Sequence, residues 1–455
     1  MCKLYRTRED SSYTNLGCIG NVKFENHLDF SEQFTGPNGK YYRRAQSDLK
    51  KGLTGSYFWS DGATKQNFRH IYAMGDVHGD LLSLMSAMFL AKLINADGEW
   101  IAKQTLFLQL GDLLDRQRPG LSRARHSSFN PREEIDIIQY LYFIDREARK
   151  YGSRVVSITG NHDLWPIEGP AMSVRKGYVG YPLQVYGSMR KRDQYWRSAG
   201  MRNYMAWYRP PVMKVNNWLA MHGGISPTNL HRCMKQLMEN GNDQNPIEWI
   251  SNEWEKGMLN PNQNFPSFVL DAMYNRYWAT NPNEQDQEEC SEHMMTMLRH
   301  FGIPKDGGLF MGHTPMFISK CGQRDSSEFH GVEVVCNRHC KTSACGGVLI
   351  DVAASEGFRE PLTAEEMKNS ALVREFKEED IRSTSVAHVD VQRNVLQRIV
   401  TDHMNQNQKT NIKSTIVRNI QQFNGHVWKT IRQEKLSKTL FDHIRSYDSI
   451  CEIPS

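Results

Sequence analysis

The sequence predicts an α/β fold, because short apolar segments alternate with helical patterns along its first half. Apolar segments that begin near Ile71, Thr105 and Val155 each end in Gly-Asp or Gly-Asn, as buried strands that enter loops do. Between them lie LLSLMSAMFLAKLINA and EEIDIIQYLYFIDREARK, whose apolar residues cover one helical face. This β-α-β-α-β succession places loops at strand ends, where α/β proteins carry functional residues.

We expect three regions along the 455 residues. Residues 1–69 are rich in Gly, Ser and aromatic residues without a sustained period and predict a loop-rich extension. Residues 70–370 hold the α/β domain, and residues 371–455 are expected to form a linker and a mainly helical C-terminal extension. The helical prediction rests on apolar residues three or four apart: Ile412, Ile416, Ile420, Phe423, Val427 and Ile431, then Leu436, Leu440 and Ile444. Such helices would either cap the core or bind a partner or a second copy of the chain.

The composition indicates a soluble protein without a nucleic-acid or membrane partner. Lys and Arg total 56 against 51 Asp and Glu, and this net charge of +5 is small for the length. Nine cysteines are too few for a disulfide scaffold, so we expect reduced thiols. The polar start MCKLYRTRED lacks the apolar stretch of a signal peptide, and no run of about 18 apolar residues could cross a bilayer. We therefore expect a cytoplasmic location.

Five short motifs follow the apolar segments in order and carry the chemistry. They are GDVHGD (75–80), GDLLDR (111–116), GNHD (160–163), HGG (222–224) and GHTP (312–315). Each alone is as compatible with an ordinary turn or a structural histidine as with a site, but all five together predict one. Their Asp, His and Asn side chains suit manganese, iron, zinc or magnesium. Two such ions a few Å apart need a carboxylate that bridges them, and the spacing of the motifs supplies one. We therefore expect a dinuclear centre.

These motifs resemble those of the calcineurin-like metallophosphoesterase superfamily, and within it the phosphoprotein phosphatases, over about residues 70 to 355. The GHTP motif and the later GGVLIDVAAS are more similar to the bacterial-type and Shewanella-like branch. The resemblance implies a β-sandwich flanked by helices and hydrolysis of phosphomonoesters. A protein phosphatase for phosphoserine, phosphothreonine or phosphotyrosine is the favoured function. A nucleotide or dinucleoside polyphosphate hydrolase and a catalytically silent binding scaffold are the alternatives.

The resemblance also implies a set of metal ligands. Two divalent ions are expected, manganese in vitro with iron or zinc as alternatives. Asp76 and His78 would hold the first ion and Asp112 would bridge both. The second ion would be held by Asn161, His222 and His313.

Other motif residues would handle the proton and the phosphate. By the same resemblance His162 is the general acid that protonates the leaving oxygen, and Asp115 orients its imidazole. Arg116 would bind the phosphate through two parallel hydrogen bonds. A second arginine usually comes from a later segment, for which Arg276 is our candidate; a surface role beside aromatic residues is its alternative.

Two positions depart from the family pattern. Gln117 stands where the family has Gly, which puts in doubt the conformation of the loop that presents Arg116. Asp163 stands where the family has Glu, so the contacts that this longer carboxylate makes are in doubt. Neither residue is an expected metal ligand.

Two further clusters have both a functional and an ordinary interpretation. A zinc site or free thiols near the substrate would explain Cys321, Cys336, His339, Cys340 and Cys345. The segment from about residue 165 to 215 is basic and aromatic. An electropositive cover over the metals, or a solvated surface, would explain Arg175, Lys176, Arg190, Lys191, Arg192, Arg197, Arg202 and Arg209.

Overall fold

The protein is described from a computed structural model. The described residues are 18–19, 22–23, 29–50, 68–95, 98–115, 133–168, 188–239, 245–280, 286–314, 332–338, 346–350, 385–390, 395–403, 416–423 and 428–436.

The first sheet has seven strands in the order β14-β13-β12-β11-β3-β4-β5. Its parallel part is formed by β3 (His70–Met74), β4 (Thr105–Gln109) and β5 (Arg154–Ser157). Between these strands the chain forms α3 (Leu81–Leu90) and α4 (Glu133–Arg149), and α5 (Asn161–Glu168) follows β5. The predicted β-α-β-α-β succession and the α/β class are thus confirmed.

The described part of the C-terminal region consists of strands, so the helices expected there are wrong for residues 416–423 and 428–436. The antiparallel half of the first sheet is formed by β11 (Ser385–Asp390), β12 (Val395–His403), β13 (Ile416–Phe423) and β14 (Trp428–Leu436). Residues four apart, such as Ile416 and Ile420, share one face of a strand as well as one face of a helix. Pairing of β11 with β3 joins these strands to the main sheet, and the expected positions Ile412, Val427, Leu440 and Ile444 lie outside the described residues.

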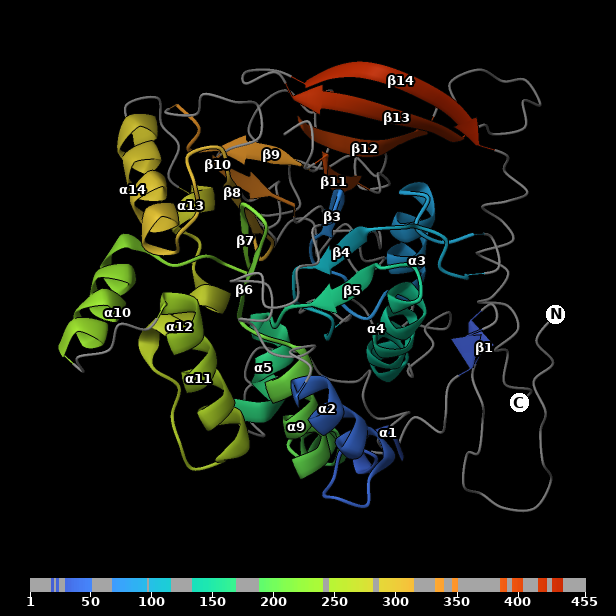
Figure 1. Ribbon diagram of the computed structural model, residues 1–455, viewed down its shortest axis with the longest axis vertical. Helices are drawn as coiled ribbons and strands as arrows, with labels where there is room; N and C mark the ends of the chain where they lie inside the picture. Colours follow the sequence, from blue (N-terminus) through green and yellow to red (C-terminus); the bar gives the residue numbers. More distant parts are fainter. Residues whose placement is uncertain are drawn as a thin grey trace, which may run out of the picture.

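The second sheet has five strands in the order β6-β7-β8-β10-β9. Its strands are β6 (Val212–Val215), β7 (Trp218–Met221), β8 (Gly308–Met311), β9 (Glu333–Val335) and β10 (Gly346–Leu349). A buried cluster that includes Ile71 and Leu108 of the first sheet and Trp218 and Phe310 of the second fills the space between the two sheets. The expected β-sandwich is therefore present (Figure 1).

Helices cover the sandwich. In Figure 1, α3 and α4 lie beside β3, β4 and β5, and β12 to β14 arch over the top of the view. The remaining longer helices are α8 (Met189–Trp196), α9 (Ala199–Tyr208), α10 (Pro227–Glu239), α11 (Pro246–Leu259), α12 (Ser267–Tyr274) and α14 (Asp286–His300), with α13 (Tyr277–Thr280) a single turn. Among the described residues, none of the helices is long and apolar enough to cross a membrane.

Residues 29–50 differ from the expected loops, because they contain α1 (Asp29–Glu32) and α2 (Lys40–Lys50). Phe34 and Tyr41 are fully buried in the main core cluster. Their rings lie against Tyr142 of α4, with ring centroids 5.6 and 5.1 Å away. These helices therefore pack as part of the core, and the short strands β1 (Cys18–Ile19) and β2 (Val22–Lys23) precede them.

One pair of cysteines differs from the composition-based expectation. Cys290 of α14 and Cys336 beside β9 form a disulfide, so the expectation of reduced thiols is wrong for this pair. Cys336 is therefore not free to bind zinc, and the other residues of the expected zinc cluster lie outside the described residues.

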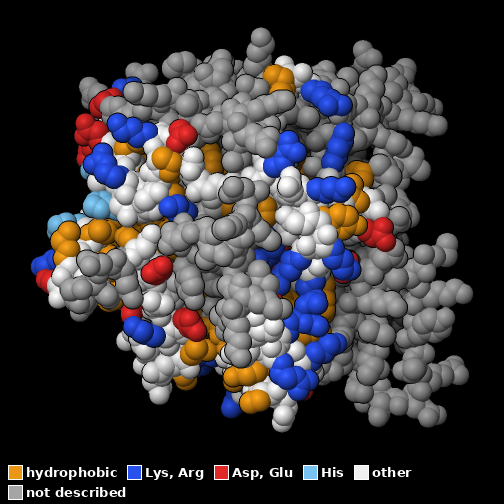
Figure 2. Space-filling model, viewed as in Figure 1, with side chains coloured by type: hydrophobic (Ala, Val, Ile, Leu, Met, Phe, Trp, Pro, Cys, Tyr) orange, Lys and Arg blue, Asp and Glu red, His pale blue; other side chains and the backbone are white. Residues whose placement is uncertain are grey.

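On the face in Figure 2, lysine and arginine side chains gather in a band at the right of the described surface.

Candidate active site

The expected metal ligands all follow strands of the sandwich, where the ends of the two sheets meet. Asp76 and His78 follow β3, Asp112 follows β4, and Asn161 begins α5 just after β5. His222 and His313 follow β7 and β8 of the second sheet. All six side chains are buried. The structure brings His78, His222 and His313 to Asp112, with Asp76 beside two of these histidines and Asn161 beside His222.

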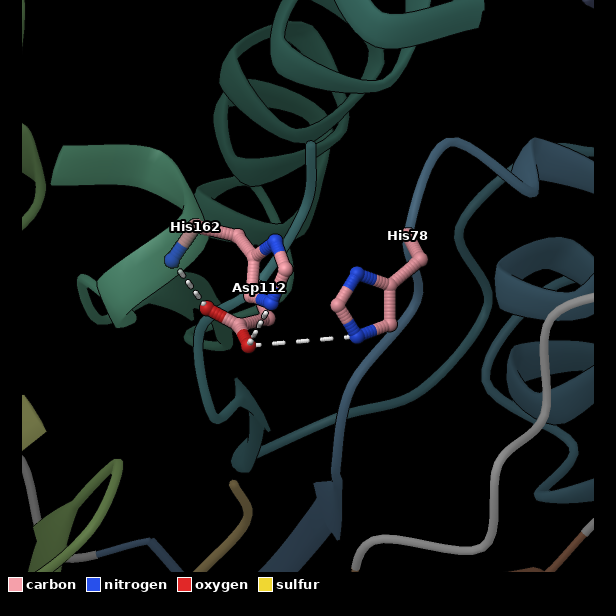
Figure 3. Close-up of side chains that lie close together, drawn as sticks. All are labelled: His78, Asp112 and His162. Carbon is pink, nitrogen blue, oxygen red and sulfur yellow. Dashed lines mark hydrogen bonds and ion pairs between the residues drawn. The ribbon is translucent and has the colours of Figure 1, made fainter. Parts of the chain in front are cut away.

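One carboxylate oxygen of Asp112 faces three imidazoles. Asp112 Oδ2 lies 3.2 Å from His222 Nε2, 3.8 Å from His78 Nε2 and 3.9 Å from His162 Nε2. Its other oxygen, Oδ1, accepts a 2.8 Å hydrogen bond from the His162 backbone N–H. Figure 3 shows Asp112 between His78 and His162, with both rings directed at the carboxylate. The Asp112 carboxylate therefore lies at the centre of the site.

Backbone carbonyls fix how two of these rings present their nitrogens. A carbonyl can only accept, so His78 Nδ1–H donates to Leu114 O at 2.8 Å and His222 Nδ1–H donates to Leu110 O at 2.6 Å. Nε2 of each ring therefore faces the centre of the site, and His222 Nε2 lies 3.1 Å from Asn161 Oδ1. Imidazole nitrogens and carboxylate oxygens that converge in this way could hold a metal ion.

His313 has the same arrangement with its two nitrogens exchanged. Its Nε2–H donates to the Tyr274 carbonyl at 3.1 Å, and its backbone N–H donates to Asp76 Oδ1 at 2.9 Å. Nδ1 is buried and has no hydrogen-bond partner among the described residues. Burial, followed by the charges of His222 and Arg276, holds the pKa of His313 well below its usual value. A neutral ring with a buried open lone pair fits a metal ligand.

Opposite charges shift two central pKa values. Burial by itself would raise the pKa of the Asp112 carboxyl, but the charge of His222 and then of His162 holds it well below its usual value. Burial would likewise lower the pKa of His222, but Asp112 and then Asp76 raise it to about 9. The site thus favours an ionised carboxylate beside positive charge.

His162 and Asp115 form a second polar unit beside this cluster. His162 Nδ1 lies 3.0 Å from Asp115 Oδ2. Asp115 Oδ1 accepts a 2.8 Å hydrogen bond from Arg192 Nη2. Burial would raise the pKa of the Asp115 carboxyl, but the charge of Arg192 lowers it below its usual value. Asp115 therefore remains an ionised acceptor for the imidazole.

The backbone at the site adopts conformations that side chains other than glycine rarely take. The φ angles are 44° at His78, 55° at Asp112, 64° at Asp115 and 68° at His313. Such strain is concentrated at functional sites, where the surrounding structure holds it. Gly111 explains how Asp112 can approach the second sheet: its φ is +94°, and a Cβ there would lie 2.9 Å from His222 Nδ1.

The sequence profile of the family described as calcineurin-like phosphoesterase matches residues 69–342, which is more than half of the chain and includes every expected ligand. The chain belongs to the calcineurin-like phosphoesterase family. The family named by the five motifs is therefore confirmed.

Relatives of this phosphoesterase include Shewanella-like protein phosphatase 1 of Plasmodium berghei, 30% identical over 184 residues, 39% of this chain and 44% of the relative. Shewanella-like protein phosphatase 2 of Arabidopsis thaliana is 33% identical over 106 residues, 23% of this chain and 24% of the relative. The matches thus span less than half of these relatives, and they confirm the Shewanella-like branch. Among solved structures, a cold-active protein-tyrosine phosphatase of a Shewanella species superposes with a TM-score of 0.38, at 15% identity over 80% of this chain and 81% of that chain.

Asp163, the residue that departs from the family's Glu, holds two of the phosphoesterase motifs together. Its Oδ1 accepts the Leu113 N–H, and its Oδ2 accepts the N–H groups of Asp112 and Gly160, all at 2.9 Å. Arg209 Nη2 donates to the same Oδ2 at 2.6 Å, and both side chains are fully buried. The shorter carboxylate therefore fixes the backbone around Asp112. Sequence reasoning had missed Arg209 as its partner.

Replacement of Arg209 with Met is expected to lower the free energy of unfolding by about 3–5 kcal/mol, because it leaves the buried Asp163 carboxylate without its counter-ion. Chemical denaturation of the purified protein measures this difference. Lys150→Met is the matched control: its pair with Glu147 is solvent-exposed and should change stability by no more than about 1 kcal/mol. Similar effects of the two substitutions would contradict the stabilising role of the buried pair.

The two expected phosphate-binding arginines differ in what can be said of them. Arg116 lies outside the described residues, as does Gln117. Arg276 is exposed on the turn between α12 and α13, and its Nη1 donates to Thr314 Oγ1 at 3.3 Å, one residue after His313. The structure therefore brings Arg276 to the edge of the cluster of expected ligands.

The expected electropositive cover is only partly a surface. Three of its arginines, 192, 202 and 209, are buried, and each donates hydrogen bonds to carboxylates or backbone carbonyls. Arg190, Lys191 and Arg197 are exposed, and Arg175 and Lys176 lie outside the described residues. Neither an electropositive cover nor a solvated surface describes the three buried arginines, because they lie inside the protein. Their hydrogen-bond partners come from segments distant in sequence.

Proposed function

We propose that this chain is a dinuclear-metal phosphatase that hydrolyses phosphomonoesters on proteins, at phosphoserine, phosphothreonine or phosphotyrosine. The observation that carries the proposal is the position of Asp112 Oδ2, which lies 3.8 Å from His78 Nε2 and 3.2 Å from His222 Nε2. A single oxygen between two such ligand sets suits a pair of ions.

We propose that Asp76 and His78 hold one ion, that Asn161, His222 and His313 hold the other, and that Asp112 contacts both. The buried open Nδ1 of His313 and the inward Nε2 atoms of the other two rings support this division. Imidazole, carboxylate and amide donors suit manganese, with iron or zinc as alternatives. When bound, two divalent ions supply Lewis-acid activation of water and neutralise charge on the phosphoryl oxygens.

The chain's own residues handle the proton and the substrate. A water molecule attacks the phosphorus opposite the leaving oxygen, and the P–O bond to that oxygen breaks. The imidazolium of His162 gives its Nε2 proton to the departing oxygen, and the proton that the attacking water releases to solvent is matched by one that reprotonates His162. The products are inorganic phosphate and an alcohol or phenol. Asp115, 3.0 Å from Nδ1, keeps the ring oriented. Arg116 and Arg276 are proposed to bind the phosphoryl oxygens.

The protein substrate is supported by the two relatives from Plasmodium berghei and Arabidopsis thaliana, both of which are named protein phosphatases. A silent scaffold is disfavoured, because all six expected ligand types are present and lie together. The burial of Arg192, Arg202 and Arg209 also removes part of the basic surface that would have favoured a polyanionic nucleotide.

Parallel assays test the substrate class. We expect phosphopeptides to be hydrolysed with a higher kcat/KM than dinucleoside polyphosphates when manganese is added, and both activities to disappear with a chelator. Release of inorganic phosphate from phosphopeptides and chromatography of the nucleotide products measure the two rates. The opposite order of kcat/KM would assign the protein to nucleotide hydrolysis, and activity that survives the chelator would contradict metal dependence.

A further inference from the structure

A buried charged network lies behind the His162–Asp115 pair and takes no direct part in the proposed reaction. Its members are Arg192 of α8 and Glu134 of α4, whose side chains have no exposed area. Buried charges are costly unless they are paired, so a network of this kind needs a physical reason.

The contacts connect Arg192 to both carboxylates. Its Nη2 lies 2.8 Å from Asp115 Oδ1 and 2.9 Å from Glu134 Oε1, and its Nε donates to Glu134 Oε2 at 3.0 Å. Glu134 Oε1 also accepts the Asp115 backbone N–H at 3.1 Å. Glu134 thus fixes the guanidinium through two bonds and Asp115 through its main chain. The remaining Arg192 bond fixes the Asp115 side chain.

This arrangement fixes the orientation of the Asp115 carboxylate and so determines where its second oxygen, Oδ2, points. Oδ1 is occupied by Arg192, so Oδ2 is the atom that faces His162 Nδ1. Without the guanidinium, two buried carboxylates would lie close together without a counter-charge, and one of them would take up a proton. A carboxyl group in that state is a weaker and less directional acceptor for the imidazole.

We propose that Arg192 is a positioning residue for proton transfer, which acts on His162 through Asp115. The inference rests on the proposed role of His162 as general acid. It gives a function to the segment before α9 that the family motifs do not cover. Arg190 and Lys191, its neighbours on α8, are exposed, so Arg192 alone of these three basic residues turns into the site.

Arg192→Met tests the proposal with two substrates. We expect the rate for an alkyl phosphate to fall by about 10- to 100-fold, part of the roughly 10²–10⁴-fold that a positioned acid contributes. The rate for nitrophenyl phosphate, whose leaving oxygen departs without a proton, should fall much less, and the content of bound manganese should stay unchanged. Equal falls for both substrates would overturn the proposal.

Two further variants separate positioning from loss of fold. Arg154→Met removes another buried guanidinium, 2.7 Å from Asp145, at the opposite end of β5, and should leave the ratio of the two rates at its wild-type value. Arg192→Lys keeps the charge but not the parallel hydrogen bonds, so its ratio should lie between wild type and Arg192→Met. A shifted ratio in Arg154→Met, or Arg192→Lys no better than Arg192→Met, would contradict a specific effect on the acid.

A spectroscopic measurement distinguishes failure of this inference from failure of the proposed function. In the zinc-loaded protein, the Nδ1–H proton of His162 should give a downfield resonance in the proton NMR spectrum, because it donates to a carboxylate. Arg192→Met should shift or broaden this resonance, and Arg154→Met should not. The resonance is observable whether or not the protein hydrolyses phosphate esters. An unchanged resonance in Arg192→Met would overturn the positioning role.

Discussion

Asp112→Asn is expected to weaken binding of both divalent ions together and to abolish most of the phosphatase activity. The substitution removes the charge of a carboxylate whose Oδ2 lies 3.8 Å from His78 Nε2 and 3.2 Å from His222 Nε2. Its effect on affinity should exceed the roughly 10–100-fold change caused by loss of an outer hydrogen-bond partner of a ligand. Metal analysis after dialysis and a titration of the rate with manganese measure the two effects.

Asn161→Ala is the comparison for this result. Asn161 Oδ1 lies 3.1 Å from His222 Nε2 and belongs to the ligand set of one ion only. We expect this variant to lose mainly one equivalent of metal, whereas Asp112→Asn loses both. Full metal content and full rate in Asp112→Asn would show that Asp112 does not bridge.

His162→Ala is expected to keep both ions while the rate falls by roughly 10²–10⁴-fold for substrates with poor leaving groups. The imidazole is bound to Asp115, and its Nε2 would supply the proton to the departing oxygen. For nitrophenyl phosphate the loss should be much smaller, because nitrophenolate leaves without a proton. Steady-state rates on both substrates, together with metal analysis, measure this difference.

Two other outcomes would each have a specific meaning. An equal fall for both substrates at unchanged metal content would remove His162 from the role of acid. Loss of metal would make His162 a ligand, which its position near Asp112 allows, since Nε2 lies 3.9 Å from Asp112 Oδ2. The proposed division of the ligands would then be revised around His78, Asp112 and His162, which lie close enough to share an ion.

Much of the fold could be predicted from the sequence where the hydrophobic pattern has one structural meaning. The patterns were clear for strands β3, β4 and β5 and for helices α3 and α4. A short apolar run before Gly-Asp or Gly-Asn indicates a buried strand, and a long segment of helical period indicates a helix. The C-terminal strands were not predictable, because Ile416 and Ile420 share one face in either structure. The pairing of β11 with β3, more than 300 residues away in the chain, decided in favour of strands.

The sequence by itself determined the family and the set of side chains that gather around Asp112, because each motif follows a strand and the strand ends meet at one edge of the sandwich. Only the tertiary structure decided which groups hold these side chains in place. Arg192 contacts Asp115 across 77 residues, and Arg209 contacts Asp163 across 46. In the sequence both arginines resemble surface charges. Burial and pairing decide the role of a charged residue, and both arise only when distant segments pack together.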